Sequence, residues 1–353
     1  MNIKSPLVRA LFEGPLDVIG DVHGEHEALE SLVERLGYDS EGGHPQGRRM
    51  VFLGDLTDRG PDSPGVVRRV RSWVESGRAQ VVVGNHELNI LRSETKHGNH
   101  WFYGQASHHE FGDCAAISHH ERRAIRDFFR SLPLALERSD LRIVHAAWVT
   151  EAIEACRASD LPVDAAYQTF DDRLRASPVF SKLHGEYLDE MRRLGAALND
   201  PATEPAATAI GPYDEYCQMG NPIRVITSGV ERVTDTPFFA SGKWRYVTRV
   251  PWWHEYPDDI PVLFGHYWRW WDPAVHPHWS KGEPQLFPDD PVGPYMAEHH
   301  RAFCVDFSVG SRYRQRRAKH PPPYHGRLAA MRWPERELVY DSEDPGKFVS
   351  GSA

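Results

Sequence analysis

The stretch VVVGNHELNI, residues 81–90, places polar side chains directly after a run of three valines. A short apolar run of this kind is typical of a buried strand. Asn85 and His86 follow Gly84 at the end of that run, and neither residue type is a good packing residue for a core. An amide oxygen and an imidazole nitrogen both bind metal ions, so this strand end is a candidate functional site.

The same arrangement recurs along the chain. Polar residues follow five other apolar runs, in GDVHG (20–24), in GDLTDRG (54–60), and at His145, His266 and Asp306. In open α/β sheets, ligands bind outside the carboxyl ends of the strands. We therefore expect these six strand ends to converge on one point.

The first ninety residues alternate between two kinds of hydrophobic pattern. Short apolar runs at 16–20, 50–53 and 79–83 predict strands. Between them, apolar residues at helical spacing predict helices over 25–37 and 63–77. A βαβαβ order of this kind predicts mainly parallel strands covered by helices.

The rest of the chain is less regular. Residues 152–196 are predicted to be helical, and the segment 199–212, rich in proline and small residues, is predicted to be a surface loop or linker. Further strands are predicted at 141–144, 224–227, 244–249, 262–264, 303–305 and 337–340. The simplest interpretation is one α/β domain over 1–353 with a helical insertion or cap at about 150–220.

Composition restricts the class of partner. The chain has 353 residues, with 41 basic and 50 acidic ones, for a net charge of -9. This balance argues against general nucleic-acid binding, which needs a basic face, while a bound metal can still attract an anionic substrate. We expect no membrane span, because no apolar run is long enough. Without a CxxC pair, free thiols and a cytoplasmic location are expected for Cys114, Cys156, Cys217 and Cys304.

The strand-end residues suit a pair of metal ions. Asp21 and His23 are two positions apart, so in an extended segment they point to the same side and bind one ion. Asp55 is positioned to bridge to a second ion, which the remaining strand-end ligands would complete: Asn85, His145 and His266. Oxygen and nitrogen donors without a thiolate suit Mn, Fe or Zn.

The motifs GDVHG, GDLTDRG and GNHE, followed by a strand-end His and a later GH, resemble the calcineurin-like metallophosphoesterase superfamily. The DRG and GNHE forms are similar to its phosphoprotein phosphatase branch and to the bacterial symmetrical diadenosine tetraphosphatases. The ordered motifs extend from residue 21 to residue 266. The resemblance implies a metallophosphoesterase-type β-sandwich core flanked by helices, with a helical insertion.

The resemblance also implies roles for single residues. The six ligands keep the assignments given above, with manganese the expected metal in both sites and Fe or Zn as alternatives. His86 would protonate the leaving oxygen, Asp58 would orient His86, and Arg59 would bind the phosphoryl oxygens. A further phosphate-binding arginine is expected, for which Arg245 and Arg249 are candidates; the alternative is that both are ordinary surface residues.

The chain departs from the family pattern in two places. His145 is followed by Ala146-Ala147, where the family has HGG or HAG. This departure puts the family's local loop geometry in doubt for this chain. The late motif is GHYW, not GHxH, which supports a second site with a single late histidine.

Two other features have both a functional and a structural interpretation. Asp306 resembles a strand-end aspartate of the tetraphosphatase-like relatives, but a turn or cap aspartate is the alternative. Five tryptophans flank the late GH motif and would either stack on a nucleobase or fill a core: Trp252, Trp253, Trp268, Trp270 and Trp271.

These observations predict a two-metal phosphoesterase. The first hypothesis is hydrolysis of phosphomonoesters, in phosphoproteins or small molecules, by attack of activated water. The second is hydrolysis of dinucleoside polyphosphates such as diadenosine tetraphosphate, which Asp306 and the tryptophans favour. A third, from another class, is a metal-binding scaffold without turnover. The expected partner is a phosphorylated protein, small molecule or nucleotide, and the sequence gives no oligomeric state.

Overall fold

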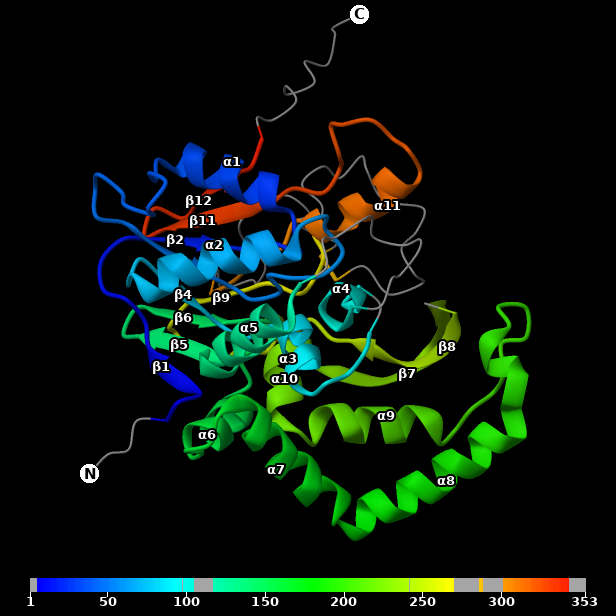
Figure 1. The fold of residues 1–353 in the computed structure, drawn as a ribbon. Helices are drawn as coiled ribbons and strands as arrows, with labels where there is room; N and C mark the ends of the chain where they lie inside the picture. Colours follow the sequence, from blue (N-terminus) through cyan, green and yellow to red (C-terminus); the bar gives the residue numbers. More distant parts are fainter. Residues whose placement is uncertain are drawn as a thin grey trace, which may run out of the picture.

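The computed structural model describes residues 5–96, 98–104, 117–240, 242–269, 286–287 and 301–342. Two five-stranded sheets stack on one another, with helices outside (Figure 1). The first sheet has the order β1 (Val8–Ala10), β5 (Ala135–Arg138), β6 (Leu141–Val144), β9 (Val262–Phe264) and β10 (Ala302–Cys304). The second has the order β12 (Glu337–Tyr340), β11 (Ala329–Trp333), β2 (Leu16–Ile19), β3 (Arg49–Phe52) and β4 (Ala79–Val81). The predicted α/β sandwich flanked by helices is confirmed.

The strands alternate between two hydrophobic cores. In β2, Leu16 and Val18 belong to the inner core, which both sheets share. Ile19 belongs to the outer core, where it meets residues of the covering helices. This period of two explains why β2 has apolar residues on both faces, since both faces are buried.

Helices cover the outside of the second sheet. Helix α1 (His26–Leu36) buries Leu29, Leu32, Val33 and Leu36, and it ends at Gly37 with φ +96°. Helix α2 (Ser63–Glu75) starts at Asp62, whose side chain accepts a hydrogen bond from the backbone N–H of Gly65. These caps and the helical spacing agree with the helices predicted over 25–37 and 63–77.

The topology explains why one edge collects the polar residues. Strands β2, β3 and β4 are neighbours and parallel in one sheet. Strands β6, β9 and β10 are neighbours and parallel in the other. Six strands therefore end at the same side of the sandwich, as the strand-end motifs predicted.

A largely helical region lies beside the sandwich (Figure 1). It contains α6 (Thr150–Arg157), α7 (Val163–Arg175), α8 (Pro178–Leu194), η1 (Gly195–Asn199), α9 (Ile210–Met219), α10 (Pro222–Ser228) and the hairpin of β7 (Glu231–Ala240) and β8 (Lys243–Arg249). The single-domain extent 1–353 and the status of 150–220 as an insertion stay predictions.

One predicted strand is wrong. The segment 224–227 is part of helix α10, not a strand. Asn221 caps this helix by accepting a hydrogen bond from the Ile223 N–H, and Pro222 occupies its first turn. The Asn-Pro start signal outweighed the β-branched residues that follow it.

Other helices surround the site or connect strands. They are α3 (Asn85–Leu91), α4 (His100–Tyr103), α5 (His119–Ser131), η2 (Trp252–His254), η3 (Val309–Ser311) and α11 (Arg312–Arg317). Strands β1, β5, β7 and β11 were not predicted, and α9 begins inside the predicted loop 199–212. Cys114, Trp270 and Trp271 lie outside the described residues. In the part of the chain that is described, no helix combines the length and apolar character needed to cross a bilayer.

Candidate metal centre

The residues predicted as metal ligands lie together at the strand ends. Asp21 follows β2, Asp55 follows β3 and Asn85 follows β4, while His145 follows β6 and His266 follows β9. Apart from half-buried Asn85, all are buried. The topology thus brings to one point residues that are up to 245 positions apart.

One group of ligand atoms surrounds a common point. His145 Nε2 lies 3.3 Å from Asn85 Oδ1 and 3.4 Å from Asp55 Oδ1. His266 Nδ1 lies 2.9 Å from the same Asn85 oxygen. The Leu53 carbonyl accepts a hydrogen bond from His145 Nδ1 at 2.7 Å, which leaves Nε2 with its lone pair. A backbone acceptor on the far nitrogen is the usual way to orient a metal-binding histidine.

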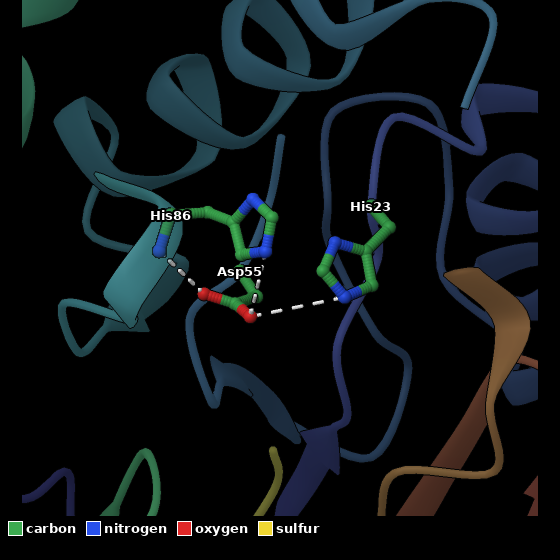
Figure 2. A group of neighbouring side chains, drawn as sticks. All are labelled: His23, Asp55 and His86. Atoms are coloured by element: carbon green, nitrogen blue, oxygen red, sulfur yellow. Dashed lines mark hydrogen bonds and ion pairs between the residues drawn. The ribbon is translucent and has the colours of Figure 1, made fainter. Parts of the chain in front are cut away.

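A second group lies on the other side of Asp55 (Figure 2). His23 Nε2 is 3.7 Å from Asp55 Oδ2 and 3.9 Å from Asp21 Oδ2. The predicted reason for the closeness of Asp21 and His23 is wrong, because the segment is not extended: His23 has φ +48° and lies in a turn. The turn, and not a strand, brings the two side chains together.

His86 and Asp58 form a buried hydrogen-bonded pair. His86 Nδ1 lies 2.6 Å from Asp58 Oδ2. The other Asp58 oxygen accepts a hydrogen bond from the indole Nε1 of Trp101 at 2.7 Å. His86 Nε2 is therefore directed away from Asp58, and it lies 3.9 Å from Asp55 Oδ2 (Figure 2).

Arg59 lies between the two histidines of this side. Its Nη1 is 2.9 Å from His23 Nε2, and its Nη2 is 3.3 Å from His86 Nε2. Its guanidinium carbon also lies 4.6 Å from the centre of the Trp268 ring. A planar fork in this position faces the space beside both histidines, where an anionic group would sit.

Several site residues have a left-handed backbone. Positive φ values of 46–74° occur at His23, Asp55, Asp58, Arg59 and His266. For residues other than glycine such conformations cost about 1–3 kcal/mol each. Strain of this kind is typical of functional sites, where the surrounding structure holds side chains in a required direction.

Residues not predicted as part of the site support it. The Glu87 carboxylate is fully buried and accepts hydrogen bonds from the backbone N–H groups of Asp55, Leu56 and Gly84. Its position in GNHE was the available signal. Side chains at Gly84 and Gly265 would collide with Asp55 Oδ1 and Asp21 Oδ1, so both positions need glycine.

Burial and neighbouring charges perturb the titrating groups. Burial and the carboxylate of Asp306 raise the pKa of Asp21 well above its usual range. Burial also opposes ionisation of Asp55, but His145 and His86 outweigh it and hold its pKa well below the usual range. Burial would lower the pKa of His86, but Asp55 and Asp58 outweigh it, so the pKa is raised. Perturbations in both directions within one cluster are typical of functional sites.

Two of the three candidates outside the ligand set, Asp306 and Arg249, lie beside the group of proposed metal ligands. Asp306 follows β10 and is buried; Ser308 N–H donates to its Oδ1 at 2.8 Å. Arg249 ends β8, and its positive charge, after burial, is the main cause that lowers the pKa of His266. Arg245 lies on the same hairpin, where its Nε donates to the Ala240 carbonyl at 3.3 Å.

The structure also places the remaining predicted features. Trp252 and Trp253 are buried in the core, whereas Trp268 is half-buried against Arg59. Ala146 and Ala147 are buried, and their N–H groups donate to the Ile226 carbonyl of α10. The alanines after His145 thus pack against a helix.

The arrangement fits divalent cations. Two sets of side chains, His23–Asp55–His86 and Asp55–His145–His266, each hold their ligand atoms within 4.8 Å of one another. Within the described residues, Asp306 Oδ2 is buried without a hydrogen-bond partner. Buried carboxylates that lack full compensation from the protein suit positive ions supplied from outside.

Comparison with known families agrees with this description. Residues 14–175 match the sequence profile of the calcineurin-like phosphoesterase family. Over residues 14–175 the chain therefore matches a calcineurin-like metallophosphoesterase domain. This family uses a binuclear centre of divalent metal ions, for which the two side-chain groups around Asp55 are the candidate ligands.

Curated relatives match part of the chain. One is named bis(5'-nucleosyl)-tetraphosphatase PrpE (asymmetrical), from Halalkalibacterium halodurans; it is 44% identical over 91 residues, which are 23% of this chain and 37% of that protein. A protein of the same name from Bacillus velezensis is 34% identical over 141 residues, 37% of this chain and 55% of that protein. The matches therefore span about a third to half of the relatives' own lengths.

Among solved structures, similar folds include a serine/threonine phosphatase from Saccharomyces cerevisiae. That chain is 12% identical with a TM-score of 0.45, and the alignment covers 98% of this chain and 87% of that one. A cold-active protein-tyrosine phosphatase of a Shewanella species is 13% identical with a TM-score of 0.43, covering 96% and 84%.

Proposed function

We propose that this protein hydrolyses phosphoesters at a centre that holds two divalent metal ions. The observation that carries the proposal is the position of Asp55, whose two oxygens face different histidines. Oδ2 lies 3.7 Å from His23, and Oδ1 lies 3.4 Å from His145. One carboxylate placed between two ligand groups is what a bridging ligand needs. Bound ions would neutralise phosphoryl oxygens and make a water molecule acidic enough to attack.

Each ligand and each catalytic residue has a proposed role. We assign Asp21 and His23 with Asp55 to one ion, and the remaining ligands with Asp55 to the other: Asn85, His145 and His266. His86 would donate a proton to the leaving oxygen from Nε2, because Asp58 holds Nδ1. Arg59 would bind the phosphoryl oxygens through its planar fork. Arg249 is the better placed of the two later arginines to do the same, since its charge acts on His266.

The metal, the role of Asp306 and the location complete the proposal. Manganese is the proposed metal, with iron and zinc as alternatives that suit the same oxygen and nitrogen donors. Asp306 would face the ions from the end of β10. A cytoplasmic location stays a prediction from the thiol content.

Two substrate classes remain in competition. The buried His86–Asp58 pair beside Arg59 favours a phosphomonoester, because leaving-group protonation and one phosphoryl clamp are all that such a substrate requires. The printed names of the curated relatives favour a dinucleoside polyphosphate. Those names say that the relatives cleave asymmetrically, whereas the sequence motifs resemble symmetrical enzymes.

Product identification tests the proposal. Manganese-loaded protein is added separately to p-nitrophenyl phosphate and to diadenosine tetraphosphate. Fast release of p-nitrophenol with the dinucleotide untouched supports a monoesterase. Cleavage of the dinucleotide to two ADP supports a symmetrical hydrolase, and cleavage to ATP and AMP supports an asymmetrical one. Full metal content without turnover of either substrate would overturn the proposal and favour the scaffold hypothesis.

A further inference from the structure

A cavity of about 330 Å³ lies between the β7–β8 hairpin and helices α9 and α10. Figure 1 shows the hairpin above α9, with α8 on the other side of that helix. The cavity is small but within the range of sites that take small ligands, roughly 300–1,000 Å³. Its wall contains four basic side chains, which are Arg224, Lys243, Arg245 and Arg249.

The basic side chains of the cavity outnumber its acidic ones. Asp214 and Glu231 are the two carboxylates in the wall, against four cations, although the whole chain has a net charge of -9. Burial raises the pKa of Asp214, while the charges of Lys243, Arg245 and Arg224 oppose that rise. The surplus of positive charge indicates that an anion fits this cavity better than a cation or an apolar group.

Two of the cations interact with Asp214 only at a distance and form no ion pair among the described residues. Within the part of the chain that the structure describes, neither Lys243 nor Arg245 makes an ion pair with a carboxylate. Arg245 uses Nε for the Ala240 carbonyl, so its two terminal nitrogens stay available in the cavity wall. Arg224 differs, because it bonds Tyr167 Oη at 2.6 Å and approaches Asp171 at 3.5 Å.

One side chain of the cavity wall also lies near the metal ligands. Arg249 lies in its wall, and the same side chain acts electrostatically on His266. The Arg249 guanidinium carbon is 5.8 Å from the centre of the Tyr267 ring, next to the ligand His266. Arg249 is therefore common to the cavity and to the surroundings of the metal ligands.

One basic side chain outside the cavity wall also acts on it. Burial lowers the pKa of Lys243, and repulsion from Arg245 and Lys96 lowers it further, while Asp214 opposes the decrease. Lys96 is itself paired with Glu94 at 3.0 Å, so its charge is partly compensated.

We propose that this cavity is a binding subsite for phosphate groups that are not themselves hydrolysed, so that the site prefers an oligophosphate to a single phosphate. The inference rests on the proposed function, because the reacting phosphoryl group would lie at the metal centre. Arg249 would contact the chain where it leaves the centre, and Arg245 and Lys243 would hold the next phosphates. Guanidinium forks match phosphate oxygens in pairs, and the ammonium adds a point charge.

The test compares one phosphate with three. Orthophosphate and tripolyphosphate are used as inhibitors of p-nitrophenyl phosphate hydrolysis in initial-rate assays, with manganese in excess over the tripolyphosphate. The cavity variant combines Lys243→Ala with Arg245→Ala. We expect its inhibition constant for tripolyphosphate to rise about tenfold more than its constant for orthophosphate, since only the longer anion reaches both side chains.

A matched control removes the same charge elsewhere. Lys182→Ala combined with Arg192→Ala acts on helix α8, where both side chains are more than three-quarters exposed at 76% and 77%. Neither inhibition constant should change in this control. An equal rise for both anions in the cavity variant, or an equal rise in the control, would overturn the subsite, because general charge would then explain the effect.

A different result would reject the proposed function without rejecting the subsite. If the unaltered protein hydrolyses no phosphoester, the same anions are titrated calorimetrically into the unaltered and cavity variants, which requires no turnover. Weaker tripolyphosphate binding by the cavity variant would then support an anion site in a protein of another activity. Equal binding would overturn the subsite as well.

Discussion

Strand β2 has a buried carboxylate near each end, and the two are compensated in different ways. Asp17, inside the strand, is fully buried; it accepts hydrogen bonds from Arg48 Nε at 3.0 and 3.1 Å and from the Tyr38 hydroxyl at 2.7 Å. Asp21, just after the strand, is also buried, but its hydrogen bonds come from the backbone N–H of His266 at 3.1 and 3.2 Å.

The difference separates a structural carboxylate from one that requires an ion. Asp17 has a full cation within hydrogen-bonding distance, so its charge is compensated by the protein itself. Asp21 is next to further carboxylates, and Asp306 raises its pKa together with burial. Burying a charge without a partner costs several kcal/mol, so the second arrangement is relieved either by protonation or by a bound cation. Burial of an acidic residue is therefore not itself a sign of function. What indicates function is a buried carboxylate whose charge the protein does not compensate with a cation of its own.

The largest expected effect is in the metal centre to which Asp21 belongs. Asp55→Asn should lose both bound metal and activity, because the shared carboxylate contacts both ligand groups. We expect turnover to fall by at least about 10³-fold, since the ions supply most of the electrostatic stabilisation. Metal content by elemental analysis and p-nitrophenyl phosphate hydrolysis check this. Unchanged metal content in Asp55→Asn would reject the bridging role.

The next effect separates a proton donor from a ligand. His86→Ala should keep both ions, because Asp21, His23 and Asp55 remain to hold the nearer one, yet lose about 10²–10⁴-fold in turnover. The loss should be smaller for p-nitrophenyl phosphate than for an alkyl phosphate, whose leaving oxygen needs a proton. Rates on both esters and the metal content measure this.

His86 also has a competing assignment that the same variant tests. Its Nε2 lies with His23 and Asp55 in one of the two ligand groups. Loss of one ion per chain from His86→Ala, with equal loss of rate on both esters, would identify His86 as a ligand. Asp58→Asn serves as the companion variant, because it removes the orienting carboxylate and leaves Nε2 in place.

Removing the cation that compensates Asp17 should lower the stability of the fold and leave metal binding unchanged. Arg48→Ala leaves Asp17 buried without its cation and also removes an ion pair to Glu335 at 2.8 Å. We expect a loss of about 3–5 kcal/mol in the free energy of unfolding, measured by urea denaturation in excess chelator. Arg192→Ala, at an exposed position, is the control. A loss of metal comparable to that of Asp55→Asn would show that the two ends are not independent.

The site was predictable from sequence to the extent that it depends on short motifs. Asp21, Asp55 and Asn85 each follow an apolar run directly, and parallel strands end at one edge, so their convergence follows from pattern and topology. The convergence of these three residues needed no knowledge of loops. The predicted ligands lie together for that reason, although the turn at His23 was read as extended.

Long-range partners were not predictable in this way. Arg48 and Glu335 are 287 positions apart, and Trp101 reaches Asp58 over 43 positions. No local pattern marks such pairs, because either residue alone resembles an ordinary surface or core residue. The same limit explains the hairpin cavity, whose lining residues come from four separate elements.

A third buried carboxylate, Glu190, gives the smallest expected change in stability. Its pKa shift fixes the direction in which that change depends on pH. Glu190 on α8 accepts hydrogen bonds from the backbone N–H groups at the start of α9, including Ala209 and Ile210 at 2.6 and 2.9 Å. Burial would raise its pKa, but these donors hold the pKa below the ordinary 4.5. A lowered pKa means that its stabilisation is present above pH 4.5 and is lost as the pH falls through the folded-state value.

Glu190→Gln should therefore cost about 2 kcal/mol at pH 7, where the charge-assisted hydrogen bonds are complete, and less at pH 3.5. Urea denaturation at the two pH values measures the difference, with Glu186→Gln, a half-exposed neighbour on the same helix, as the control. Like Asp17, Glu190 is compensated by the protein, so the metal content should not change. A destabilisation of equal size at both pH values would mean that the packing of the side chain, and not its charge, connects α8 to α9.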